Sequence, residues 1–391
     1  MGWTLIRGGY LFAPEDLGIQ DLLVVDGRIA AIGSDLPQLG EAYPLEINDA
    51  QDKIVLPGLI DGHLHIIGAS GLGGPTTRTT DLQISRITMM GVTTVISPLG
   101  ADSLSRTIPD LLSRAMQMDA EGITAYCYTG GWRKPVPTLT GDPLKDVTYI
   151  DRVLGIKVAI AESKAPFLSV EDLSVLAHAA IIGGKLSGKR TVLHVHVGDR
   201  DEGLRPLEEA VARTGLPVDQ FVATHVNRNP NLWEQAIHYA KSGGRIDITT
   251  MQKPEAGYPK AIDASRGILD ALEKDVPISR MTMSSDGGAA YPRPSSKPGS
   301  GKFYMAGPDS ILETVRELVK AGLSWGKAVS FVTNHTADLL GLVRKGRLKV
   351  GSDADILILT RPGDVDRVYC RGRLMVKDGK PVVRGLFEVG A

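Results

Sequence analysis

Two histidines separated by a single residue form the most informative chemical feature of the chain. His63 and His65 end the segment Gly-Leu-Ile-Asp-Gly-His-Leu-His, which follows the apolar run Ile54–Leu56. Residues two positions apart on a strand point to the same face, so both imidazoles can reach one ion. Imidazole nitrogens suit zinc and other divalent transition metals. Because such a pair also occurs by chance on surfaces and in cores, the interpretation depends on further ligands.

Other residues with metal-binding side chains occur where later apolar runs end. They are Lys157 in Gly-Ile-Lys-Val-Ala-Ile, His194 and His196 in Leu-His-Val-His-Val, His225 in Ala-Thr-His-Val, and Asp286 in Ser-Ser-Asp-Gly-Gly. In a barrel of parallel strands, the C-terminal strand ends meet on one face, where catalytic residues gather. His196 is nearer the end of its run than His194, so we predict His196 as a ligand and His194 as a deeper hydrogen-bonding residue. The Asp286 carboxylate can bind metal and also accept a proton from metal-bound water.

The remaining three histidines do not fit this pattern. His178, His238 and His335 are expected at surface or helix-capping positions.

Lys157 is unusual because it interrupts an otherwise apolar run. A lysine is rarely buried without a partner, and a bare ammonium in a metal pocket repels cations. Carboxylation of the amine by CO₂ would give a carbamate anion able to bridge two metal ions. Alternatively, the side chain extends to the barrel rim and keeps its charge in water. The sequence leaves both interpretations open.

Strand-like and helix-like segments alternate through the middle of the chain. The expected strands are Ile54–Leu56, Thr93–Pro98, Ile123–Tyr128, Gly155–Ile160, Thr191–His196, Phe221–His225, Arg245–Thr249 and Met281–Ser284. The expected helices are Leu82–Met90, Ser103–Asp119, Ser169–Ile182, Leu232–Lys241, Ile262–Glu273 and Asp309–Lys320. Eight strands alternating with helices favour an α/β fold of the (β/α)₈ TIM-barrel type over an open doubly wound sheet.

Both ends of the chain are instead rich in short strands. We predict that residues 1–57 and 343–391 pair into one small antiparallel β-sandwich domain. That domain flanks a metal-binding barrel formed by residues 58–342.

Composition limits the possible partners and location. The 391 residues include 44 basic and 45 acidic side chains, with no basic stripe, so no nucleic acid partner is expected. No segment reaches the roughly 18 apolar residues of a membrane span, and the N-terminal residues lack a signal-peptide pattern. Cys127 and Cys370 both occur in strand-like runs, which predicts buried free thiols rather than a disulfide. A cytoplasmic location without membrane attachment is therefore expected.

The ordered ligand set resembles that of the amidohydrolase superfamily. The segment Lys349–Ile356 is also similar to that superfamily's return into its small β domain, and within it the chain looks most similar to bacterial isoaspartyl dipeptidases. This resemblance runs nearly end to end, through residues 12–16, 74–79, 151–157, 224–229, 246–249 and 284–287. It implies two zinc ions bridged by carboxylated Lys157 and a hydroxide. One ion would be held by His63, His65 and Asp286 and the other by His196 and His225, with Asp286 as the catalytic base. It also implies a homo-oligomer.

The substrate-binding positions depart from the pattern of that family. The glutamate that grips a free α-amino group falls at Leu72, and a mobile-loop tyrosine falls at Trp132. One carboxylate-binding arginine falls at Lys164 and a serine at Ala290, whereas a second arginine survives as Arg228. Leu72 cannot hold an ammonium, and an unpaired amine buried beside it costs about 1–3 kcal/mol or more.

Three functions compete on this basis. The first is hydrolysis, by metal-bound hydroxide, of an amide bond in a small carboxylate-bearing substrate such as a β-aspartyl dipeptide. The second uses the same centre on an N-acyl amino acid or a cyclic amide, with an altered pocket. The sequence leaves these two open. A non-catalytic scaffold is disfavoured, because all six ligand positions are filled and buried charges are costly to retain.

Overall fold

The centre of the molecule is a barrel of eight parallel strands. This computed structural model describes residues 2–37, 45–69, 71–292 and 303–388. The strands follow one another in sheet order from β13 to β6, and a parallel bridge between Leu64 and Gly287 joins the two end strands just beyond their ends. Their bounds are β6 (Leu59–Asp61), β7 (Val92–Ser97), β8 (Thr124–Gly130), β9 (Val153–Ile160), β10 (Val192–Val197), β11 (Phe221–Thr224), β12 (Arg245–Thr249) and β13 (Met281–Ser284). The predicted (β/α)₈ barrel is confirmed.

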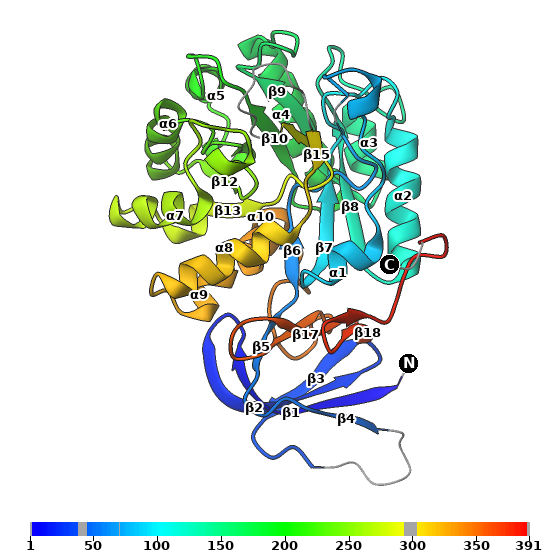
Figure 1. Cartoon of the computed structure of the whole chain (residues 1–391). Helices are drawn as coiled ribbons and strands as arrows, with labels where there is room; N and C mark the ends of the chain where they lie inside the picture. The colour runs from blue at the N-terminus through cyan, green and yellow to red at the C-terminus, as the bar shows by residue number, and fades with distance from the viewer. Residues whose placement is uncertain (1, 38–44, 70, 293–302, 389–391) are drawn as a thin grey trace.

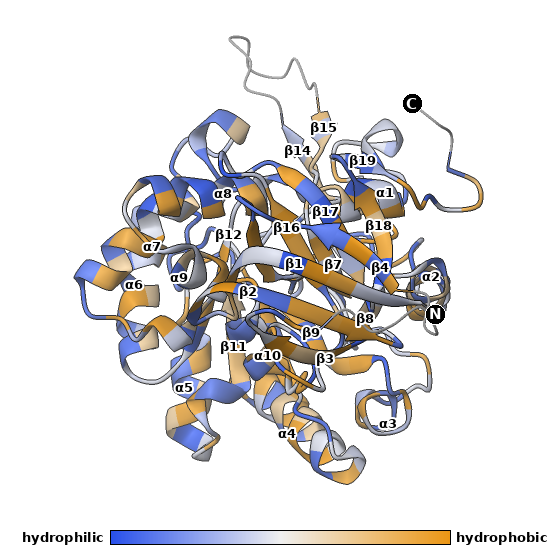
Figure 2. Ribbon diagram, turned by 90° about the horizontal axis from the view of Figure 1, so that it is seen from below, coloured by the Kyte–Doolittle hydropathy of each residue, from blue (hydrophilic) through white to orange (hydrophobic). Residues whose placement is uncertain are grey.

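Helices surround the barrel strands (Figure 2). They are α1 (Ile84–Thr88), α2 (Ile108–Glu121), α3 (Pro143–Tyr149), α4 (Val170–Ser187), α5 (Arg205–Thr214), α6 (Pro230–Lys241), α7 (Ala264–Glu273), α8 (Asp309–Lys320), α9 (Trp325–Ser330) and α10 (Asn334–Leu340). Side-chain caps fix where several of them begin: Ser169 forms a capping box with Asp172 at α4, and Asn229 caps α6. The sequence analysis did not predict α3, α5, α9 or α10.

A second sheet combines strands from both ends of the chain (Figure 1). Its order is β19-β18-β17-β16-β5-β1-β2-β3, and β4 pairs with β1. The bounds are β1 (Trp3–Phe12), β2 (Asp16–Val25), β3 (Arg28–Gly33), β4 (Leu45–Asp49), β5 (Ile54–Pro57), β16 (Ile356–Leu359), β17 (Val365–Cys370), β18 (Arg373–Lys377) and β19 (Lys380–Pro381). The sheet is mixed rather than wholly antiparallel, because β4 and β5 both run parallel to β1.

The first barrel strand lies later in the chain than predicted. Ile54–Pro57 pairs with β1 and β16 in the mixed sheet, and the barrel begins at Leu59. Gly58 lies between the two sheets, where a side chain would collide with Thr93. Because the apolar run continues across this junction, hydropathy alone does not show where one sheet ends. The domain limits at 57/58 and 342/343 remain predictions.

Both cysteines and one of the three remaining histidines are buried. Cys127 and Cys370 are buried and free, as predicted. His335 is also buried, contrary to expectation, and its Nδ1 lies 3.2 Å from the Met281 carbonyl oxygen. Within the described ranges, no helix is long and apolar enough to cross a membrane.

A buried ion cluster ties the return into the mixed sheet to the barrel. Lys345 Nζ lies 2.7 Å from Asp355 Oδ2, 3.0 Å from Asp353 Oδ2 and 2.7 Å from Thr124 Oγ1 on β8. Lys345 is only 5% exposed, so its ammonium depends on these partners.

We predict that Lys345→Met destabilises the protein by about 3–5 kcal/mol, because it leaves the buried Asp355 carboxylate without a cation. Urea unfolding measures the change. Arg361→Met is the matched control, since Arg361 pairs with Asp52 at 3.3 Å on an exposed surface. Equal midpoints for the two variants would contradict this role of Lys345.

Candidate metal centre

The ends of five barrel strands bring the predicted ligands to one cavity. The cavity has a volume of about 450 Å³. Its lining includes His63, His65, Lys157, His196, His225 and Asp286. Two of these residues have backbones in the left-handed region, His225 with φ 69° and Asp286 with φ 56°. Such conformations are uncommon outside glycine and gather at functional sites.

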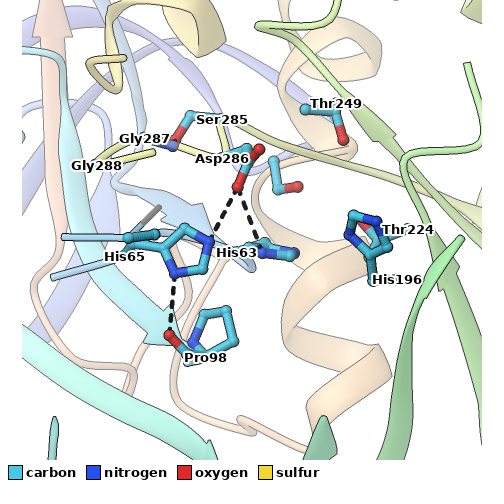
Figure 3. A network of polar contacts seen from close by, with 12 residues as sticks. His63, His65, Pro98, His196, Thr224, Thr249, Ser285, Asp286, Gly287 and Gly288 are labelled. Carbon is cyan, nitrogen blue, oxygen red and sulfur yellow. Dashed lines mark hydrogen bonds and ion pairs between the residues drawn. The ribbon is translucent and has the colours of Figure 1, made fainter. Parts of the chain in front are cut away.

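Asp286 faces the histidine pair that follows β6 (Figure 3). Its Oδ1 lies 3.1 Å from His65 Nε2 and 3.5 Å from His63 Nε2. Backbone pairing fixes this approach, because the Asp286 amide donates to the His63 carbonyl at 3.0 Å. Hydrogen bonds from His65 and Tyr291 lower the pKa of the Asp286 carboxyl against the opposing effect of burial. The carboxylate is therefore ionised at neutral pH.

Three imidazoles are held through their Nδ1 atoms. The contacts are His65 Nδ1 to the Pro98 carbonyl oxygen at 3.1 Å, His225 Nδ1 to Thr249 Oγ1 at 2.7 Å and His63 Nδ1 to His194 Nε2 at 3.0 Å. These contacts leave Nε2 of each ring for the cavity. A partner on the second ring nitrogen is the usual arrangement around a histidine that binds metal. His194 lies beneath His63, as predicted, and stacks on Tyr128 with ring centroids 4.7 Å apart.

The donor set fits a metal ion. Ligand atoms of His63, His225 and Asp286 all lie within 4.8 Å of one another, and all three residues are buried. Two ligands of one tetrahedral zinc lie about 3.3 Å apart when each bond is near 2.0 Å. The His65–Asp286 and His63–Asp286 separations agree with that value. An imidazole lone pair and a carboxylate at such a distance also require a proton or a cation between them.

Lys157 is buried beside this set. It is 1% exposed, and its Nζ lies 3.5 Å from His63 Nδ1. Burial lowers the pKa of the Lys157 ammonium to about 7. Within the described part of the chain Lys157 forms no ion pair, and the alternative that it reaches the rim is wrong. A buried lysine without a carboxylate partner fits a modified or metal-binding role better than a structural one.

Glu162 is a site residue that the sequence analysis missed. Its Oε2 lies 3.3 Å from His196 Nε2, and Glu162 is only 3% exposed. Burial opposes ionisation of Glu162, but contacts with His196 and Lys164 lower its pKa to about 2. Burial lowers the pKa of His196 to about 3, so at neutral pH the pair is a carboxylate and a neutral imidazole. The sequence did contain a signal, because Glu162 lies two residues beyond the end of β9.

Further buried oxygens support the centre. The Tyr291 hydroxyl donates to Asp286 Oδ2 at 2.7 Å, and Tyr291 is fully buried. Below the cavity, Asp247 accepts hydrogen bonds from Thr224, Thr282 and Ser284 at 2.8, 2.7 and 2.5 Å. Asp61 accepts from Ser285, and burial raises the pKa of Asp61 to about 7. None of these residues carried a distinctive motif in the sequence.

All five predicted substrate-binding residues line the same cavity. They are Leu72, Trp132, Lys164, Arg228 and Ala290. The Arg228 guanidinium lies 3.5 Å from His196 Nε2 and 5.8 Å from the centre of the Tyr258 ring. The Trp132 ring centroid lies 4.3 Å from that of His196, whereas Leu72 is 58% exposed at the opening. The cavity thus combines a metal-binding floor with two cations and an aromatic wall.

The chain belongs to the amidohydrolase family, whose sequence profile matches residues 158–375. The barrel and its donor set are those of a metal-dependent hydrolase of this family. The chain is similar in structure to a β-aspartyl dipeptidase from Fervidobacterium islandicum AW-1, crystallised in complex with a β-Asp-Leu dipeptide. The TM-score is 0.88 at 30% identity, covering 97% of this chain and 98% of that one.

Curated relatives have other activities in their names. An L-hydantoinase from Paenarthrobacter aurescens is 26% identical over 433 residues, covering 97% of this chain and 91% of its own length. A dihydroorotase from Lactiplantibacillus plantarum is 27% identical over 415 residues, covering 94% and 90%. Membership of the family therefore leaves the substrate open.

Proposed function

We propose that the protein is an isoaspartyl dipeptidase-like hydrolase that cleaves an amide bond in a small, carboxylate-bearing substrate. The observation that carries this proposal is the 0.88 TM-score to a β-aspartyl dipeptidase across nearly the whole of both chains. A cavity with two cations beside a metal-binding floor suits a substrate of that kind.

Two divalent ions, with zinc as the proposed metal, fit the donor set. His63, His65 and Asp286 would hold one, and His196 and His225 the other. Carboxylated Lys157 would bridge them, for which its burial next to His63 provides the position. When bound, such ions polarise a carbonyl and activate water for attack on an amide.

The chain's own residues would supply proton transfer and binding. Asp286 accepts a proton from the attacking water and delivers it to the leaving nitrogen, so one amide and one water give a carboxylic acid and an amine. The Tyr291 hydroxyl donates a hydrogen bond to the other oxygen of the Asp286 carboxylate. Arg228 offers a bidentate fork for a substrate carboxylate, and Lys164 adds a second positive charge at the opening.

A second candidate is a hydrolase of N-acyl amino acids or cyclic amides. The apolar side chain of Leu72 at the opening supports it, as do relatives named L-hydantoinase and dihydroorotase. A pocket of this kind favours an uncharged or blocked nitrogen, because an unpaired ammonium loses its hydration without compensation.

A hydrolysis screen of the zinc-loaded protein distinguishes the two candidates. The panel contains β-aspartyl-leucine, its N-acetyl form, N-acetyl amino acids, hydantoin and dihydroorotate. Release of leucine from β-aspartyl-leucine or its acetylated form supports the first proposal. Hydrolysis of the N-acetyl amino acids or the cyclic amides, without release of leucine from either dipeptide, would replace it with the second.

We predict that Lys157→Ala loses at least one of two bound ions and most activity, because the variant lacks the amine that would carry the bridging carbamate. Short carboxylic acids that enter the vacated space should partly restore both. Elemental analysis after gel filtration measures the metal. Two tightly bound ions in Lys157→Ala would contradict the bridging role of Lys157.

Asp286→Asn tests the proton acceptor. It preserves the size of the side chain but removes its basicity, so we expect turnover to fall by about 10²–10⁴. Metal content should fall much less, because an amide oxygen can still contact the ion. Steady-state kinetics with parallel metal analysis measures both. Near-normal turnover removes Asp286 from the mechanism.

Leu72→Glu tests whether an ammonium lacks a partner at the opening. We expect kcat/KM for β-aspartyl-leucine to rise about tenfold or more, since the new carboxylate can pair with the free α-amine. The N-acetyl form, which lacks that charge, is the matched control substrate and should not gain. If the unmodified protein already cleaves β-aspartyl-leucine with a kcat/KM of about 10⁵ M⁻¹s⁻¹, the free α-ammonium does not lack a partner in the pocket.

A further inference from the structure

The contact between Glu162 and His196 determines which nitrogen of His196 carries a proton. Two groups lie near His196 Nε2: Glu162 Oε2 at 3.3 Å and Arg228 Nη2 at 3.5 Å. A carboxylate can only accept hydrogen bonds, so the shorter contact, with Glu162, favours an N–H on Nε2. The lone pair of the ring then lies on Nδ1. The same logic gives the opposite result at His65, whose Nδ1 faces the Pro98 carbonyl oxygen, leaving the lone pair on Nε2.

We infer that Glu162 is a positioning residue that fixes His196 in the Nε2–H form and presents Nδ1 as its metal ligand. This inference rests on the proposed function in taking His196 as a ligand of the second ion. A hydrogen bond to a carboxylate also raises the basicity of the opposite ring nitrogen, which strengthens a metal–imidazole bond. The first ion would then contact Nε2 of His65, and the second would contact Nδ1 of His196.

Glu162 also organises the two cations of the cavity. Its Oε1 accepts from the Lys164 backbone amide at 3.2 Å and lies 3.6 Å from Lys164 Nζ, while Oε2 lies 4.0 Å from Arg228 Nη1. The carboxylate is therefore already shared by an imidazole and two cations. It has little capacity left for a substrate ammonium, but it holds the positive groups that a substrate carboxylate would contact.

The first test measures metal binding without substrate. Metal-free wild type, Glu162→Gln and Glu162→Leu are titrated with zinc by calorimetry and by competition with a chelator. We expect the second ion to bind about tenfold more weakly in Glu162→Gln and about a hundredfold more weakly in Glu162→Leu. Glu202→Gln, a partly exposed carboxylate that pairs with Arg200 at 3.6 Å, is the matched control and should bind as wild type does.

The first ion serves as an internal check on folding. Retention of that ion in both Glu162 variants shows that the barrel is intact, because its proposed ligands come from the loop after β6 and the end of β13. Unchanged affinity for both ions in Glu162→Leu overturns the inference.

The second test reads the tautomer directly. Long-range ¹H–¹⁵N correlation of zinc-loaded, ¹⁵N-histidine-labelled wild type should show the His196 ring protonated at Nε2, with assignment from His196→Gln. Protonation at Nδ1 overturns the inference even if the affinities fall. Neither test uses substrate, so both can be interpreted even if the protein lacks the proposed amidase activity. Conversely, a negative result for the Glu162 inference does not affect the hydrolysis screen.

Discussion

The constraint on which this structure depends is the burial of charge at the C-terminal end of the barrel. Asp286, Glu162, Asp247 and Lys157 all lie nearly or wholly out of water. In such surroundings each charge needs a partner, a proton or an ion. Asp247 has three hydroxyl donors, and Glu162 has cations and an imidazole. Lys157 forms no ion pair among the described residues, and the proposed carboxylation would convert it into an anion whose partners would be divalent ions.

The barrel and most proposed ligands were predictable because strand ends carry a distinctive signal. His196, His225 and Asp286 each break an apolar run at its C-terminal end, and in a parallel barrel those ends converge. Lys157 stood out for the related reason that a charge inside an apolar strand is costly. These inferences need only residue type and position, which the sequence contains.

Other features depended on spatial information that the sequence lacks. The run from Ile54 to Ile60 contains no polar side chain, yet it divides between two sheets at Gly58. The seven-residue helix α3 has too few turns to show a periodic pattern. Glu162 carried a usable signal at a strand end, but its importance comes from closeness to His196 and Arg228, which lie far away in the sequence. Tyr291 became visible only through its hydroxyl contact with Asp286.

The bridge between Leu64 and Gly287 closes the barrel where β6 and β13 meet. Leu64 lies between His63 and His65, and Gly287 follows Asp286, so the closing seam and the first proposed ion site coincide. An ion held there would cross-link the first and last strands of the barrel. The chain between these strands is long, and cross-links that close long loops remove the most conformational entropy from the unfolded chain. Besides such an ion, the described contacts across this seam are a few backbone hydrogen bonds, the hydrogen bonds from Ser285 to Asp61 and the contacts of Asp286 with His63 and His65. Loss of the proposed ion should therefore speed hydrogen exchange at this seam, so metal supply would affect the lifetime of the folded protein as well as its activity.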